Sequence, residues 1–102
     1  MTVKLVVLYT QPGDAGAFDE HFLGTHRPLV SKLPGLRRAE SGRLVTPLDR
    51  GEHTYHRMTE LYFADQAALD AALGSPEGSA VYADFKQIAS PGSRMFIQNL
   101  DN

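Results

Sequence analysis

Residues 19–36 read DEHFLGTHRPLVSKLPGL, and the rest of the predicted architecture is arranged around them. On a helical wheel of about 100° per residue, five side chains near this stretch share one face. They are Phe18, Phe22, Thr25, Leu29 and Leu33. The spacing predicts an amphipathic helix from about residue 15 to residue 33, ended sharply by Pro34-Gly35.

His26 falls at the edge of that apolar face, so its imidazole is predicted to point toward the body of the protein. Pro28 follows two residues later, where it removes a backbone donor and crowds the carbonyl of Gly24. We therefore expect a kink near His26. The kink could be a simple bend in a stable helix, or it could open room beside His26 for a ligand.

Length and composition narrow the classes of function. The 102 residues suit a single domain, 1–102. A net charge of -2 and a pI near 6.0 give no field that would gather nucleic acid or anionic lipid. The absence of cysteine excludes disulfides, thiolate metal sites and a cysteine nucleophile, and it fits a cytoplasmic protein. No apolar run approaches the about 20 residues of a membrane span, so no membrane attachment is expected.

Four stretches have the character of strands, and they are residues 3–9, 36–47, 55–63 and 93–100. The first and third are apolar on both alternating faces, which predicts central strands. The second is predicted to be interrupted at Gly42. Three N-caps are expected for the helices, namely Asp14, Asp65 before a short helix that breaks at Gly74, and Ser75 before Pro76.

The resulting order is β-α-β-β-α-β, with the last helical segment broken in two. Short connections and right-handed crossovers favour an α+β, ferredoxin-like fold, in which helices cover one face of a four-stranded antiparallel sheet. Apolar residues of both parities in the first, third and fourth strands leave the other face hydrophobic. We therefore predict a homodimer whose two sheets pack face to face, as a dimeric α/β barrel.

Four motifs in this order resemble the EthD family, and they are KLVVLY, HFLGTHRPLVSKLPGL, ELYF and SPEGSAVYADF. The most specific is the run TH-x-PL-x-x-K-x-PGL over residues 25–36. The resemblance implies a dimeric α/β-barrel fold, akin to muconolactone isomerase and the antibiotic-biosynthesis monooxygenases, with a pocket in each subunit. It implies function less closely, because this superfamily includes isomerases, cofactorless oxygenases and polyketide dehydratases or decarboxylases.

His26 is the best candidate general base, because the pKa of histidine lies near neutrality and an apolar wall favours the neutral imidazole. The alternative is a core histidine satisfied by a backbone carbonyl. Tyr9 at the end of the first strand could bind a carbonyl or phenol of a substrate, or it could be an amphipathic edge residue. Phe22 lies four residues before His26, where it would line the same space or serve as plain core.

Asp84 and Glu60 are the candidate acid partners of His26. Asp84 lies on the margin of the last helix, where it could orient His26 or be solvated. Glu60 shares one strand face with Tyr62, a further candidate for substrate binding, and the sequence does not say which face meets the helices. If the other face does, Glu60 is expected to pair with an arginine across strands.

Metal, nucleotide and RNA sites are not expected. His21 and His26 are five residues apart, about 140° different in direction on an α-helix. Haem held by His26 alone stays an alternative, and no other cofactor is expected. Walker, G-x-G-x-x-G and G-x-S-x-G motifs are missing from the sequence. The third strand, YHRMTELYF, lacks the glycine of an RNA-recognition module and carries Glu60 instead.

We therefore expect a small protein that binds a hydrophobic, aromatic or polyketide-like compound in a pocket of each subunit. The expected chemistry is isomerisation, dehydration or decarboxylation in a degradation or secondary-metabolite pathway, with His26 as acid and base. One alternative is a non-catalytic binding or accessory protein of ether or aromatic degradation. The other is a cofactorless monooxygenase.

Overall fold

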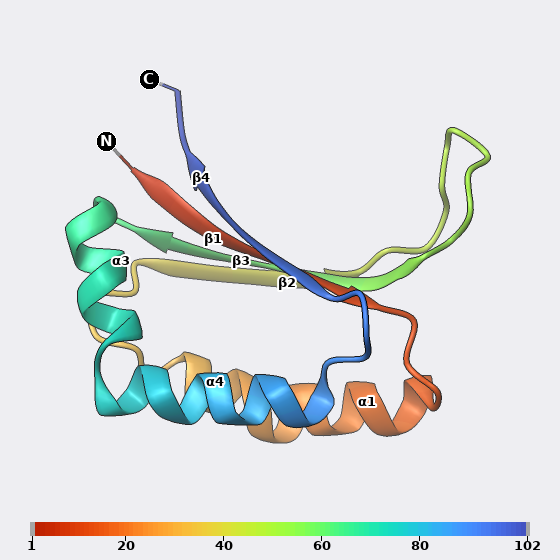
Figure 1. Ribbon diagram of the computed structural model, residues 1–102, viewed down its shortest axis with the longest axis horizontal. Coiled ribbons are helices and arrows are strands. Elements are labelled where there is room, and N and C mark those ends of the chain that lie inside the picture. Colours follow the sequence, from red (N-terminus) through yellow and green to blue (C-terminus); the bar gives the residue numbers. More distant parts are fainter. Residues whose placement is uncertain (1, 102) are drawn as a thin grey trace.

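The computed structural model describes residues 2–101, which form a four-stranded antiparallel sheet with helices on one face (Figure 1). The strands are β1 (Val3–Thr10), β2 (Arg38–Arg43), β3 (Tyr55–Phe63) and β4 (Arg94–Asn99). Their order across the sheet is β2-β3-β1-β4, so the two apolar strands lie in the centre. The ferredoxin-like fold predicted from the sequence is confirmed.

The face of the sheet that meets the helices is now defined. Alternate residues of β1, from Val3 to Tyr9, are buried beneath the helices, as are Leu61 and Phe63 of β3. Glu60 and Tyr62 have the other parity and are half-buried on the uncovered face. Strand β3, which carries large residues on both faces, therefore points Leu61 and Phe63 toward the helices.

The second strand differs from its prediction. β2 is shorter than residues 36–47, and it is not interrupted at Gly42, which pairs with Met58 of β3. All six residues of β2 are exposed at the sheet edge, so a glycine there gives up little side-chain packing. Residues 44–54 then form a long loop that extends away from the sheet (Figure 1).

The first helix is not one α-helix to residue 33. It consists of α1 (Ala15–His21), a π-helical segment η1 (Phe22–His26) and α2 (Arg27–Val30). Asp14 caps α1, as predicted, by accepting a hydrogen bond from the amide of Ala17 at 3.0 Å. The amide of Arg27 donates to the carbonyl of Phe22, five residues earlier. This wider turn precedes Pro28, which has no amide to donate and would crowd a carbonyl four residues back.

The π segment changes which side chains point inward. In an α-helix, a side chain four residues further along is rotated by about 40° around the helix axis relative to the first. A wider turn removes that rotation. Phe18, Phe22, His26 and Val30 consequently form one buried row at intervals of four residues. The expectation that Thr25 lies on the apolar face is wrong, since Thr25 is exposed, and Leu29 is only half-buried.

The other two helices are α3 (Gln66–Leu73) and α4 (Pro76–Ile88), and their predicted N-caps are confirmed. Asp65 accepts from the amide of Ala68 at 2.9 Å, and Ser75 accepts from the amide of Gly78 at 3.0 Å. A side chain at Gly78 would collide with the carbonyl of Ala72, so glycine permits the close approach of α4 to the end of α3. Within residues 2–101, no helix has the length and apolar character needed to cross a membrane.

Candidate active site between the first helix and the sheet

His26 lies at the end of the π segment, and only 3% of its surface is exposed. Its Nε2 atom is 3.3 Å from the hydroxyl oxygen of Tyr9 on β1. Its Nδ1 atom is 2.8 Å from Oδ2 of Asp84 on α4. The structure thus brings together three residues that the sequence had singled out separately, and Asp84 is buried instead of solvated.

These contacts define the proton positions on His26. The Asp84 carboxylate can only accept, so Nδ1 of His26 carries the proton and donates it. The lone pair of Nε2 then faces Tyr9, whose hydroxyl donates to it. A carboxylate, an imidazole and a hydroxyl in this sequence can move one proton toward or away from a bound molecule.

The surroundings favour a neutral imidazole beside a charged carboxylate. Burial lowers the pKa of His26, and the nearby Asp84 carboxylate offsets this only in part. Burial would raise the pKa of Asp84, but hydrogen bonds from His21 and His26 outweigh it and hold that pKa below 3.8. Burial and the charge of Asp84 raise the pKa of Tyr9, which keeps its hydroxyl protonated.

His21 is a site residue that sequence reasoning missed. Its Nε2 atom is 2.8 Å from Oδ1 of Asp84, so one carboxylate bridges His21 and His26. In an α-helix these two histidines would diverge by about 140°, but a turn that bonds residues five apart places them on the same side. Pro28 is the sequence feature that could have indicated this pairing, because the irregular turn predicted beside it is what aligns His21 with His26. The side chain of His21 is 37% exposed and gives the cluster an edge in water.

A hollow of about 50 Å³ lies beside His26 and Tyr9, between the sheet and α4. Its other walls are aliphatic and aromatic, and they include Val7, Leu61, Val81 and Phe85. Five of its lining residues, which are Leu5, Leu73, Gly78, Tyr82 and Met95, also line a groove of about 450 Å³ at the β4 edge. The acid/base cluster therefore adjoins an apolar space that opens to solvent.

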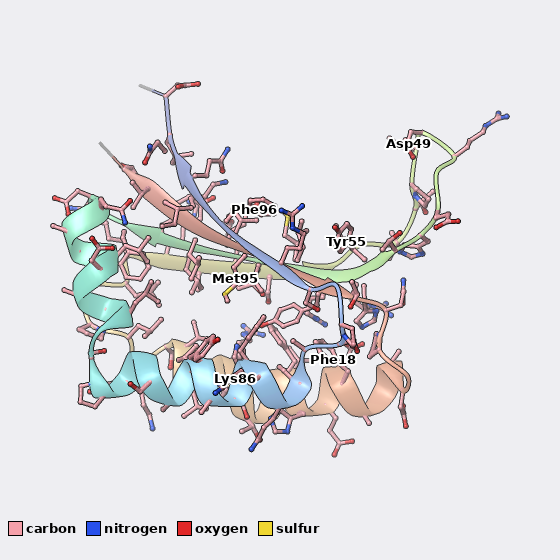
Figure 2. All side chains as sticks on the ribbon, in the orientation of Figure 1. Phe18, Asp49, Tyr55, Lys86, Met95 and Phe96 are labelled. Carbon is pink, nitrogen blue, oxygen red and sulfur yellow. The ribbon has the colours of Figure 1, made fainter. Side chains whose placement is uncertain are left out.

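Figure 2 shows how β4 divides its side chains between the two faces of the sheet. Met95 extends toward α4, on the side of the groove, whereas the side chain of Phe96 extends to the other face, although Phe96 also borders the groove. Met95 is 43% exposed and Tyr82, across the groove, is 52% exposed. Apolar side chains this open at the mouth of a cavity are typical of a ligand-binding groove.

Phe22 is buried, but it does not line the hollow beside His26. Its ring packs against the rings of His26 and Tyr9, with centroids 5.5 Å and 5.8 Å away. It contributes to a second hollow, of about 320 Å³, on the β2 side of the helix. Phe22 therefore supports the two catalytic candidates from behind.

Glu60 and Tyr62 do not belong to this site. Both point to the uncovered face of the sheet, because that parity of β3 lies opposite Leu61 and Phe63. Glu60 forms an ion pair with Lys4 at 3.2 Å, where an arginine was expected. The hydroxyl of Tyr62 donates to Glu60 at 3.1 Å. Their candidate roles as acid partner of His26 and as substrate-binding residue are therefore corrected.

A second buried polar cluster was also not anticipated. Asp19 on α1 accepts hydrogen bonds from His56 at 2.8 Å and from Arg57 at 3.2 Å. The guanidinium of Arg57 lies 4.6 Å from the centroid of the Phe22 ring. Among residues 2–101, no group of three or more histidine, cysteine or acidic side chains is placed to hold a metal ion.

Comparisons with known proteins show the family and the fold of this chain. The family model described as EthD domain matches residues 11–92. An uncharacterised 11.0 kDa protein from the thcB-thcC intergenic region of Rhodococcus erythropolis is 35% identical over 94 residues, covering 92% of this chain and 90% of the relative. An ethyl tert-butyl ether d (EthD) family protein from Bacillus halodurans is 39% identical, with a TM-score of 0.92 over 99% of this chain and 100% of that one.

A more distant similarity concerns the fold alone. SnoaB from Streptomyces nogalater, described as a cofactor-independent oxygenase, has a TM-score of 0.70 at 17% identity. The match covers 99% of this chain and 94% of SnoaB. At this identity the two chains share an architecture, and chemistry has to be argued from the side chains present.

Proposed function

The chain belongs to the EthD family, and we propose that it binds a small aromatic or polyketide-like compound and catalyses acid/base chemistry on it through His26. One observation carries the proposal: the Asp84–His26–Tyr9 chain of hydrogen bonds ends at the wall of an apolar hollow. The groove at the β4 edge would receive the hydrophobic part of the compound.

The proposed reaction begins with proton transfer to Nε2 of His26 from a carbon next to an activated carbonyl. The compound displaces the Tyr9 hydroxyl from Nε2, and that hydroxyl then donates to the carbonyl oxygen, where negative charge develops. Asp84 stabilises the imidazolium that forms. Return of the proton to another carbon completes an isomerisation, whereas its transfer to a hydroxyl group, as the carbon–oxygen bond of that group breaks, releases water and completes an elimination. His21 connects Asp84 to solvent, so the cluster can exchange its proton with water.

No cofactor enters this proposal. The proton steps proposed above use the side chains of His26, Tyr9 and Asp84 alone. SnoaB is described as cofactor-independent, which is consistent with chemistry carried by side chains alone.

Proton exchange tests this function directly. A panel of aryl ketones in deuterated water, followed by NMR, should show exchange at the carbon next to the carbonyl with the native protein. Replacing His26→Gln should reduce that exchange by about 10³-fold and leave ligand affinity within a few-fold. Equal exchange rates for the two proteins would overturn the acid/base role.

The two alternatives give different outcomes in the same assay. A non-catalytic binding protein would bind a ketone without any exchange in the native protein. A cofactorless monooxygenase would consume oxygen with a phenolic compound, and His26→Gln would stop that consumption. SnoaB is the reason to measure oxygen uptake, because its description names such an activity on a shared fold.

We further propose that the protein is a homodimer through the uncovered face of the sheet. That face carries Val6, Leu8 and Met58, which are half-buried, and Phe96, which is 40% exposed. An apolar sheet face of this kind favours association with a second copy. Sedimentation should give twice the chain mass for the native protein and the chain mass for Phe96→Asp. Met95→Asp, on the other face of the same strand, is the matched control and should remain dimeric.

A further inference from the structure

The hydroxyl of Thr59 is the only buried side-chain polar atom without a hydrogen-bond partner among residues 2–101. Thr59 lies on β3, and 6% of its surface is exposed. Buried hydroxyl groups are almost always hydrogen-bonded, because loss of water without a replacement is unfavourable. An exception inside a folded sheet therefore calls for a partner that is not part of the chain.

The position of Thr59 places this residue at the wall of the candidate active site. Thr59 pairs with Val7 of β1, so it is a diagonal neighbour of Tyr9 on the face that meets the helices. It lines the hollow that also contains His26 and Tyr9. Most of the remaining wall is aliphatic and aromatic, so Thr59 is the second polar side chain, after Tyr9, that the sheet contributes to this hollow.

Thr59 also lines the second hollow on the β2 side of the helix. It shares this role with Val30, while Arg27, Glu40 and Ser41 make that second hollow polar. The two hollows thus adjoin at Thr59 and Val30, with apolar walls on one side and polar side chains on the other.

We propose that Thr59 binds a second oxygen atom of the ligand, and that the ligand is therefore a ring compound with two oxygen functions on one ring. This inference rests on the proposed function, since it concerns the same hollow. One oxygen lies at Tyr9 and His26, the other accepts or donates a hydrogen bond at Thr59, and the apolar body extends into the groove at β4. Two polar anchors on one floor would select against compounds that carry a single oxygen.

Binding of three naphthalene probes tests this assignment without any need for turnover. The probes are naphthalene, 1-naphthol and 1,3-dihydroxynaphthalene, measured by calorimetry with the full chain. With the native protein, the diol should bind about tenfold more tightly than 1-naphthol. Thr59→Val, which keeps the shape of the side chain, should abolish that difference and leave the affinity for 1-naphthol within about twofold. Thr59→Ser, which keeps the hydroxyl, should retain most of the difference.

Thermal unfolding without ligand separates a binding role from a structural one. Thr59→Val should melt at the same temperature as the native protein or higher, because it removes an unpaired buried hydroxyl. A clear fall in melting temperature would show that the hydroxyl has a partner within the protein and would overturn the proposal. So would an equal preference for the diol in native protein and Thr59→Val, or no binding of the diol at all. If the native protein prefers the diol but shows no exchange that depends on His26, only the proposed catalysis is refuted, and the role of Thr59 in binding stands.

Discussion

Two carboxylates, the buried Asp84 and the half-buried Asp19, show how the same group serves different ends in this fold. Each one accepts hydrogen bonds from two side chains. Asp84 joins two histidines and adjoins an open hollow. Asp19 joins His56 to Arg57, whose positive charge is permanent, and aromatic rings cover that cluster.

The difference lies in what the partners can do with a proton. Neither partner of Asp84 holds a permanent charge, so the cluster can gain and lose a proton while its geometry is kept. Burial would raise the pKa of Asp19, but His56 and then Arg57, whose guanidinium packs on the ring of Phe22, outweigh it and lower that pKa. Figure 2 shows the neighbouring Phe18 extending from α1 toward the sheet, where it packs edge-on against His56. One cluster is suited to chemistry, and the other fastens the helix to the sheet.

The largest expected effect comes from making the same substitution at both carboxylates and measuring the exchange reaction. Asp84→Asn should slow exchange by about 10³-fold, because an amide can neither fix the tautomer of His26 nor stabilise its imidazolium. Asp19→Asn should change the rate per folded molecule by less than threefold. If the two variants lose activity equally, the assignment of different roles to the two clusters is wrong.

The stability of the two variants should rank in the reverse order. Asp19→Asn leaves the buried Arg57 charge without its partner, so the free energy of unfolding should fall by about 3 kcal/mol. Asp84→Asn loses hydrogen bonds between a carboxylate and two histidines, for which about 1.5 kcal/mol is expected. Urea denaturation measures both values. The control is Glu20→Gln, at an exposed position of α1 next to Asp19. Its free energy of unfolding should stay within about 0.5 kcal/mol of the native value.

Much of this architecture could be predicted from the sequence, because it depends on local patterns. The runs of large apolar residues in β1 and β3, and the caps at Asp14, Asp65 and Ser75, specify their elements almost independently of the rest of the chain. The direction of His26 also followed from its place on the helical wheel. These features need no knowledge of what lies across the core.

The partners of His26 could not be predicted in the same way. Whether Asp84 reaches His26 depends on how α4 packs against the π segment, which is a contact between residues 58 positions apart. The pairing of His21 with Asp84 depends on a helical turn that the 3.6-residue period does not describe. Glu60 was misplaced because both faces of β3 carry large side chains, so the sequence pattern could not choose between them.

Histidine titrations give a finer test of the site. His21→Gln should raise the pKa of His26, because it removes a neighbouring group that disfavours the charged imidazole. Asp84→Asn should lower that pKa further, because it removes the carboxylate that favours the charge. NMR of the imidazole protons across pH 4 to 8 would measure both shifts. Shifts in the opposite directions would contradict the electrostatic picture of the cluster.

The smallest effect concerns stability in acid. The folded pKa values of Asp19 and Asp84 lie below 3.8, so their contribution is present above that pH and is lost as the pH falls through the folded values. The folded pKa of His26 lies below 6.5, so protonation of the unfolded chain already reduces stability as the pH falls below 6.5. Urea midpoints at several pH values should show both steps, and His26→Gln should lack the upper one.

The π segment also bears on how such a site can arise from an ordinary helix. A helix that gains one residue must either rotate everything after it or accommodate the surplus in a wider turn. Here the surplus is kept between Phe22 and Arg27, so a shortened gene without the Thr25 codon should restore a regular spiral. Such a deletion should keep Val30 and Leu33 directed toward the interior, because the wider turn had absorbed the surplus residue, and it should leave the two histidines four positions apart on one face of the helix.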